Sequence, residues 1–151
     1  MKVVVQKSKK AYVKVEEEIV GQIDSGLVLL VGFTHGDTMK EIEYMANKIV
    51  NLRIFLDENN VMNKSIKEVG GDILSVSQFT LYADTKKGNR PSYINALGEK
   101  EANILYQKFN EKLKELGMKV ETGRFRSEMV VCLENDGPTT IIMEKKGDYN
   151  E

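Results

Sequence analysis

Apolar residues recur with two different periods along this chain, and each period predicts a different element. In the N-terminal stretches KVVVQ and AYVKVEEEIVGQI, apolar and charged residues alternate, which is typical of strands with one exposed face. We expect two strands here, joined by a turn at KSKK. The apolar run at residues 26–33, GLVLLVGF, is too short for a buried helix and predicts a buried strand.

Two longer segments show the 3.6-residue period of amphipathic helices. In the first, TMKEIEYMANKIVNLRIF, Thr38 and Glu41 have the spacing of a capping box, so the threonine is expected to cap this helix. The second covers about residues 98–116 and is followed by Gly117, a residue suited to the position after a helix. We interpret the apolar stripe of the second helix as core.

Strand patterns return in the C-terminal half, in DILSVSQFTLYAD (72–84), MKVETG, SEMVVCLEND and TTIIME. Because strands dominate and come in runs, we predict an α+β fold with mainly antiparallel sheet. No repeat or linker interrupts the pattern, so we expect one domain over residues 1–151, with a polar tail from about residue 145. Gly137 and Pro138 separate the last two patterns, and a turn is the simplest interpretation.

Composition restricts the chemistry that the chain can perform. Of the 151 residues, 41% are hydrophobic and 30% charged, and the formal net charge of −1 argues against a general nucleic-acid coat. A single cysteine and a single histidine exclude an intrachain disulfide and a histidine-cluster metal site, and leave little room for a catalytic triad. We interpret Cys132 as a core residue and His35 as a turn residue. With no signal-peptide or membrane-span pattern, the protein is expected in the cytoplasm.

Candidate chemistry is concentrated in the segment SVSQFTLYADT and in the basic turn that follows it. Hydroxyl and amide side chains occupy a pattern that otherwise predicts a buried strand, and buried polar groups need partners or a function. A solvated strand edge is the alternative interpretation. Basic side chains beside the turn in KKGNRPSY can hold phosphate, although exposed lysine-rich turns are common.

Three motifs follow one another along the chain: SQFTLYAD (77–84), GNRPS (88–92) and NDGPTT (135–140). Together with TGRF (122–125), they resemble the D-aminoacyl-tRNA deacylases over nearly the whole chain. The resemblance implies an enzyme that hydrolyses the ester between a D-amino acid and the 3′-terminal adenosine of tRNA, with no cofactor and no metal. It also implies a cytoplasmic homodimer with curved, barrel-like, mainly antiparallel sheets and two main flanking helices.

The resemblance also assigns roles to individual residues. The expected catalytic residues are Gln78, Phe79 and Thr80, with backbone N–H groups near the first two as oxyanion donors. Thr80 is either a nucleophile or a positioning hydroxyl, and we favour a mechanism in which the terminal ribose 2′-hydroxyl helps to activate water. The expected substrate-binding residues are Ser77, Asn135, Gly137 and Pro138, and the expected tRNA contacts are Lys86, Lys87 and Arg90.

By the same resemblance, the Gly137–Pro138 peptide bond is expected to be cis and to reach into the active site of the partner subunit. Main-chain atoms there would exclude the side chain of an L-amino acid. Glycine would pass, so mischarged Gly-tRNA(Ala) is a further expected substrate. One departure from the family is Lys7, where arginine is common, so a brace on this loop would lose a bidentate group.

Other interpretations stay open at this point. The chain is also similar to the editing domain fused to archaeal threonyl-tRNA synthetases, so another mischarged tRNA is the alternative substrate. A non-catalytic module that binds the tRNA end, and a structural dimer whose polar strands have no function, are the alternatives to an enzyme. A deacylation assay separates these hypotheses.

Overall fold

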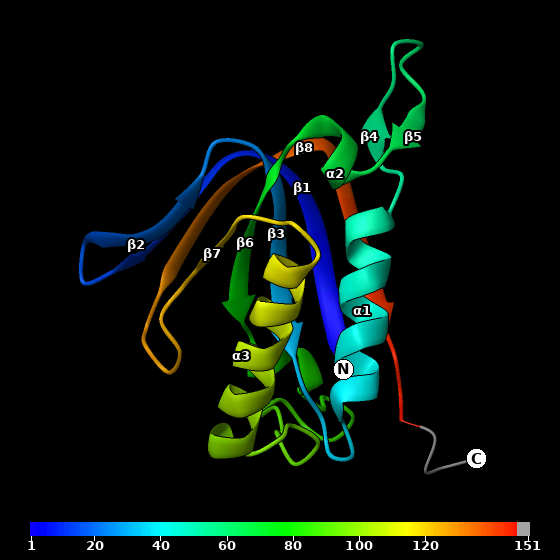
Figure 1. The fold of residues 1–151 in the computed structure, drawn as a ribbon. Helices are drawn as coiled ribbons and strands as arrows, with labels where there is room; N and C mark the ends of the chain where they lie inside the picture. Colours follow the sequence, from blue (N-terminus) through cyan, green and yellow to red (C-terminus); the bar gives the residue numbers. More distant parts are fainter. Residues whose placement is uncertain (148–151) are drawn as a thin grey trace.

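The protein is built on one strongly curved sheet that carries its two long helices on one face (Figure 1). The computed structural model describes residues 1–147, so part of the expected polar tail, residues 148–151, lies outside the described residues. The six strands of the sheet are β1 (Lys2–Val15), β2 (Glu18–Ile23), β3 (Gly26–Gly32), β6 (Asp72–Ser77), β7 (Val120–Thr122) and β8 (Val130–Glu144).

Strand β1 organises this sheet, because it pairs antiparallel with β2, β3 and β8. Strands β3, β6 and β7 run parallel to one another, which the sequence patterns did not indicate. The outer strands β2 and β7 meet where Gly21 lies against the backbone of Thr122, and a Cβ on this glycine would lie 2.3 Å from the threonine carbonyl oxygen. The sheet is therefore nearly closed, and the predicted barrel-like α+β class with two main helices is confirmed.

Both predicted amphipathic helices are present, as α1 (Met39–Asn51) and α3 (Glu99–Glu115). Thr38 caps α1 as predicted: its hydroxyl accepts the Lys40 N–H at 3.2 Å, and the Glu41 carboxylate accepts the Thr38 N–H at 2.7 Å. The start of this helix is therefore determined by residues that are close in sequence.

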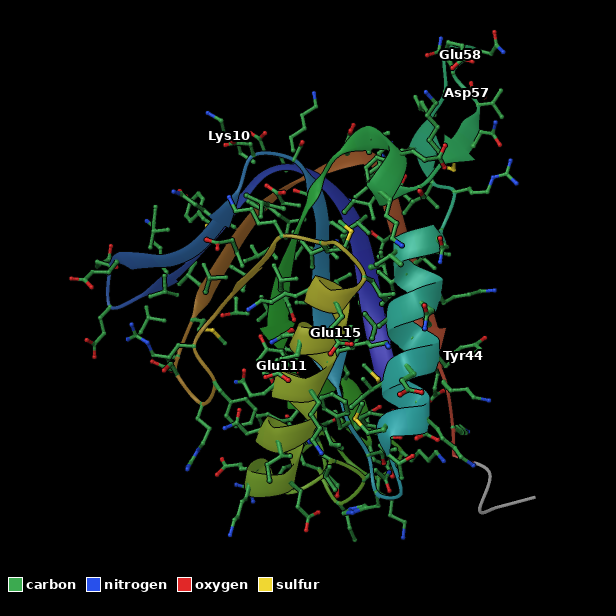
Figure 2. The ribbon with its side chains drawn as sticks, in the orientation of Figure 1. Lys10, Tyr44, Asp57, Glu58, Glu111 and Glu115 are labelled. Carbon is green, nitrogen blue, oxygen red and sulfur yellow. The ribbon has the colours of Figure 1, made fainter. Side chains whose placement is uncertain are left out.

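A hairpin and a short helix between α1 and β6 were not predicted. The hairpin strands are β4 (Phe55–Leu56) and β5 (Met62–Lys64), and the helix is α2 (Ile66–Val69). Figure 2 shows Asp57 and Glu58 at the end of the hairpin, which projects beyond the sheet. The apolar residues of β4 continue the period of α1, which is why the pattern overstated the length of that helix.

The hydrophobic core has two parts, one on each face of the sheet. The larger part lies between the sheet and the helices and includes Leu29, Ile49 and Phe109. The smaller part lies on the opposite face and includes Val13 and Val28. Successive residues of a strand point to opposite faces. Strand β3 is apolar throughout because both of its faces are covered, as its continuous apolar run predicted.

Strand β1 continues through KSKK, so the turn predicted there is wrong. Ser8 pairs with Gly26 of β3 and with Asn135 of β8, and Lys7 and Ser8 are buried, whereas Lys9 and Lys10 are exposed. The Ser8 hydroxyl donates to the Glu134 carbonyl at 3.1 Å. Neighbouring strands thus cover polar residues that, read alone, suggest a turn. The chain turns instead at Glu16 and Glu17, whose φ angles are 49° and 67°.

Strand β6 ends at Ser77, so the strand predicted over residues 72–84 is wrong in its second half. Ser77 pairs with Val31, and the Gln78 N–H donates to the Val31 carbonyl at 2.7 Å. Strand β3 ends one residue later and offers no further partner. The chain then tightens into a 3₁₀ helix, η1 (Phe79–Tyr82), and the alternation of faces expected for a strand does not apply.

The last two predicted strands form the single strand β8, so the turn predicted at Gly-Pro is also wrong. Ser8 pairs with Asn135 and Gln6 pairs with Thr140, which leaves residues 136–139 opposite one residue of β1. Proline has no N–H to contribute to a ladder, so it is tolerated at such an irregularity. Residues 136–139 are called the Gly-Pro bulge below.

Candidate active site

The motif SQFT stands at the carboxyl end of β6, where the strand gives way to η1. The Gln78 side-chain amide donates a hydrogen bond to the Thr80 hydroxyl. The Gln78 backbone N–H is engaged with β3, whereas Phe79 and Thr80 are the first residues of η1. The first N–H groups of a helix have no acceptor within it. Two neighbouring backbone donors are therefore available for a ligand oxygen at this point.

A cavity of about 630 Å³ opens beside this motif and is lined by Ser77, Gln78 and Phe79. Phe79 is 55% exposed, and its ring meets the Tyr93 ring edge to face, with 5.0 Å between centroids. Thr80 is not part of the lining, but its hydroxyl is hydrogen-bonded to the Gln78 side chain. The structure thus places Gln78 and Phe79 in the cavity wall and Thr80 next to it.

Helix α3 fixes the strand that carries this wall. The Tyr106 hydroxyl donates to the Ser75 carbonyl at 2.7 Å, two residues before the motif begins, and both residues are buried. Burial raises the pKa of Tyr106, so the side chain stays a neutral donor. The motif is therefore held from two sides, by β3 through Gln78 and by α3 through Tyr106.

The opposite wall of the cavity comes from residues to which the sequence patterns gave no role. The loop between β7 and β8 contributes Phe125, Arg126 and Met129, and the start of α3 contributes Glu99. TGRF carried part of the family resemblance, but no pattern indicated where its side chains lie. Only the topology, which sets β7 beside β6, brings this loop to the motif.

The Gly-Pro bulge is held by one side chain. The Asn135 amide donates to the Lys7 carbonyl and to the Thr139 carbonyl, both at 3.0 Å, and so ties the bulge to β1 and to itself. The Gly137–Pro138 peptide bond is cis, and both residues are exposed. Lys7 lies against the bulge, with its ammonium 4.0 Å from the Asp136 carboxylate.

The bulge and the SQFT motif lie at opposite ends of the sheet. Lys7, opposite the bulge, pairs with Leu27 at the start of β3, whereas Ser77 pairs with Val31 near its end. Four residues along a strand span about 13 Å. Strands β1 and β3 also separate β8 from β6. The bulge lies by the β4–β5 hairpin, since the Lys7 ammonium lies over the Phe55 ring. The arrow of β6, which ends at the SQFT motif, points away from this hairpin (Figure 1). One chain does not bring the two motifs together.

The basic residues after the motif lie outside this cavity. Lys86, Lys87 and Arg90 are exposed on a loop that backbone hydrogen bonds between Asp84 and Ser92 close, at 2.7 and 2.9 Å. Lys86 lines a separate cavity of about 570 Å³ at the other end of η1. The candidate tRNA contacts are thus adjacent to the site but not part of its wall.

The remaining candidates of the sequence lie elsewhere. The His35 ring contacts the Ile94 carbonyl at 2.9 Å, and Cys132 is half-buried on β8 rather than fully buried in the core. Neither lines the candidate cavity. Within residues 1–147, no group of three or more His, Cys, Asp or Glu side chains is arranged to hold a metal ion. No helix in the described part of the chain has the length and apolar character needed to cross a membrane.

Known proteins are similar to this chain in both sequence and fold. The chain is 58% identical over 144 residues to the D-aminoacyl-tRNA deacylase of Brevibacillus brevis, covering 95% of this chain and 99% of that protein. It is 56% identical over 146 residues to the D-aminoacyl-tRNA deacylase of Halalkalibacterium halodurans, covering 97% and 100%. The structure of the c-Myc DNA Unwinding Element Binding Protein matches with a TM-score of 0.91 at 38% identity, covering 97% of this chain and 100% of that one.

A second solved structure, described as a probable eukaryotic D-amino acid tRNA deacylase, matches with a TM-score of 0.81 over 94% of this chain and 97% of that one. At 17% identity it shows the fold alone. The family described as D-Tyr-tRNA(Tyr) deacylase matches residues 4–144. The family resemblance drawn from the motifs is confirmed, and this chain belongs to the D-Tyr-tRNA(Tyr) deacylase family.

Proposed function

We propose that this protein hydrolyses the ester bond of D-aminoacyl-tRNA, releasing the D-amino acid and the tRNA. The observation that carries the proposal is the pair of neighbouring backbone donors at Phe79 and Thr80, the first of which lines a cavity of about 630 Å³. Paired N–H groups are the usual means of stabilising the oxyanion of an acyl transfer. The named relatives from Brevibacillus brevis and Halalkalibacterium halodurans are D-aminoacyl-tRNA deacylases.

The cavity has separate places for the two parts of the substrate end. The rings and thioether of Tyr93, Phe125 and Met129 form walls on which the terminal adenine can stack. The ester carbonyl would then point at the N–H groups of Phe79 and Thr80. Water adds to the carbonyl carbon, the bond from this carbon to the ribose oxygen breaks, and that oxygen takes up a proton.

Thr80 is better suited to positioning than to nucleophilic attack. A nucleophilic hydroxyl needs a base to accept its proton. The group hydrogen-bonded to the Thr80 oxygen is the Gln78 amide nitrogen, which is a donor. We therefore propose that the Gln78–Thr80 pair holds the attacking water or the ribose, and that the terminal 2′-hydroxyl helps to activate water.

Selection of the D-enantiomer is proposed to come from the Gly-Pro bulge of a second subunit. Gly137 and Pro138 of the bulge are exposed and lie far from the cavity of their own chain, and β8 pairs only with β1 among the described strands. In a homodimer, the main chain at Gly137 and Pro138 would enter the partner's cavity. There it would accept a hydrogen bond from the substrate amine and exclude an L side chain. Glycine has no side chain to exclude, so Gly-tRNA(Ala) is also a proposed substrate.

The rest of the tRNA would contact the enzyme outside the cavity. Lys86, Lys87 and Arg90 are exposed beside η1, where they can approach phosphates of the acceptor end. Because aminoacyl-tRNAs serve translation, we propose that the enzyme acts in the cytoplasm.

The first prediction concerns the enantiomers. Purified protein is expected to release D-tyrosine from D-Tyr-tRNA while leaving L-Tyr-tRNA largely intact, measured by acid precipitation of labelled aminoacyl-tRNA over time. Saturable binding of tRNA without loss of the ester would support a binding module instead. Equal rates on the two enantiomers would contradict the proposed steric exclusion.

The second prediction concerns Thr80. Thr80→Ala should lower kcat by about 10- to 100-fold, because it removes a positioning group and leaves the backbone donors in place. Thr80→Ser, which keeps the hydroxyl, serves as the matched control and should stay within a few-fold of wild type. A loss of about 10⁴-fold or more in Thr80→Ala, together with an acyl-enzyme trapped on wild type, would establish a nucleophile instead.

The third prediction concerns the brace on the bulge. Asn135→Ala removes two hydrogen bonds that hold the bulge, so the ratio of L-Tyr-tRNA to D-Tyr-tRNA hydrolysis should rise by about tenfold. Ser8→Ala is the matched control, because Ser8 bonds to Glu134, outside the bulge. Both variants are assayed well below their melting temperatures. An unchanged ratio in Asn135→Ala would show that the brace has no part in selection.

A further inference from the structure

Two exposed residues that line the candidate cavity form an ion pair, and the part of the cavity edge where they lie is called its mouth below. Arg126 lies in the loop between β7 and β8, and Glu99 is the first residue of α3. The Arg126 Nε lies 2.9 Å from a Glu99 carboxylate oxygen. Both residues line the cavity that contains the SQFT motif. Among the described residues that line it, Arg126 is the only lysine or arginine.

Arg126 is placed to take a second acceptor. Its side chain is 65% exposed, and its pairing with Glu99 is through Nε. The two terminal amino groups of the guanidinium carry further N–H donors, which suit a second oxyanion. The backbone of Arg126 has a φ of 63°, in a region that residues with side chains enter only when the surroundings require it. The exposed side chain of Arg126 thus lines the cavity from a fixed point of the loop.

We propose that Arg126 binds the phosphate that joins the terminal nucleotide of the substrate to the nucleotide before it. This inference rests on the proposed function. If the ester lies at η1 and the adenine on Phe125 and Met129, then Arg126, an exposed lining residue next to Phe125 in the chain, is near enough to meet the 5′ phosphate of the ribose. A guanidinium is the side chain best matched to phosphate oxygens.

The charges around the mouth make this arginine necessary for such a contact. Glu99 and Glu128 both line the cavity, and their carboxylates oppose the approach of a phosphodiester. Glu99 is compensated by its pairing with Arg126. Glu99 thus acts as a positioning residue that orients the arginine, and Arg126 supplies the positive charge.

A different reading of the same pair is a latch that fastens the loop to α3 without any ligand. Exposed ion pairs contribute little to stability, so a latch of this kind would be weak. The two readings differ in what they predict for substrates with and without the 5′ phosphate, because a latch would act on both alike.

The decisive experiment compares two minimal substrates, the D-tyrosyl esters of adenosine and of adenosine 5′-(methyl phosphate), which carries the single charge of a phosphodiester. Wild type is expected to prefer the phosphorylated ester by about tenfold in kcat/KM, as a charge-assisted hydrogen bond at a half-exposed site implies. Arg126→Ala should reduce this preference to about one. Arg126→Lys should retain part of it, since the charge remains but the planar fork is lost.

Arg124→Ala is the matched control. Arg124 lies two residues before Arg126 in the same loop but lines a different cavity, with Lys14 and Glu16. This variant should keep the wild-type preference for the phosphorylated ester. Glu99→Gln should keep or increase that preference, because the amide oxygen can still accept from Arg126 while the negative charge that opposes the phosphate is removed.

Two results would overturn the proposal. One is an unchanged preference for the phosphorylated ester in Arg126→Ala. The other is an equal loss of activity on both esters in Arg126→Ala and in Glu99→Gln, which would identify a latch. Calorimetric titration with adenosine and adenosine 5′-(methyl phosphate) gives the same comparison without turnover. If wild type hydrolyses neither ester but binds the phosphorylated nucleoside more tightly through Arg126, the proposed function fails and the phosphate site stands. Equal binding of the two nucleosides by wild type removes the phosphate site.

Discussion

The hydrogen bond from the Gln78 N–H to the Val31 carbonyl ends the pairing of β6 with β3, and the candidate site depends on where this pairing ends. A strand that loses its partner must satisfy its backbone groups in another way. Here the chain closes into η1, and the tightening of the chain leaves the N–H groups of Phe79 and Thr80 without an acceptor in the helix. Two neighbouring main-chain donors are therefore freed beside the cavity that Phe79 lines, and they require no unusual side chain.

The Gly-Pro bulge, at the opposite end of the sheet, also forms where a strand loses its regular pairing. Strand β8 interrupts its pairing with β1 between Asn135 and Thr140, and Gly137 and Pro138 of the displaced segment are exposed. The Asn135 amide compensates for the missing ladder bonds by binding the Lys7 and Thr139 carbonyls. In both places the enzyme is proposed to use main-chain atoms freed by an irregular strand. This use of the backbone is consistent with a chain that has one histidine and one cysteine.

Periodicity predicted the parts of the fold that depend on local sequence. The capping box at Thr38, the apolar run of β3 and the stripe of α3 are each determined by neighbours in the chain. Periodicity failed where a distant strand decides the outcome. The first half of KSKK is extended because Ser8 pairs with β3 and β8, and the segment after Ser77 leaves the sheet because β3 ends. A pattern of residues contains neither piece of information.

The same distinction applies to the site. Ser77, Gln78 and Phe79 were found from the polar residues of one segment and from the family resemblance. No pattern indicated that Tyr93 and Arg126 line the site. Tyr93 lies between η1 and α3, and Arg126 lies in the β7–β8 loop, which the parallel pairing of β6 and β7 brings to the motif. Residues that act by position rather than by type are visible only once the topology is known.

The central claim, that backbone donors of one subunit and the bulge of another form a single site, is tested most directly by one structure determination. The ligand is a 3′-amide analogue of D-tyrosyl-adenosine, which the enzyme does not hydrolyse. The account predicts that the amide carbonyl oxygen lies about 3 Å from the backbone nitrogens of Phe79 and Thr80. Gly137 and Pro138 of a second copy should contact the ligand amine. A carbonyl oxygen bound elsewhere, or a site complete within one chain, would contradict it.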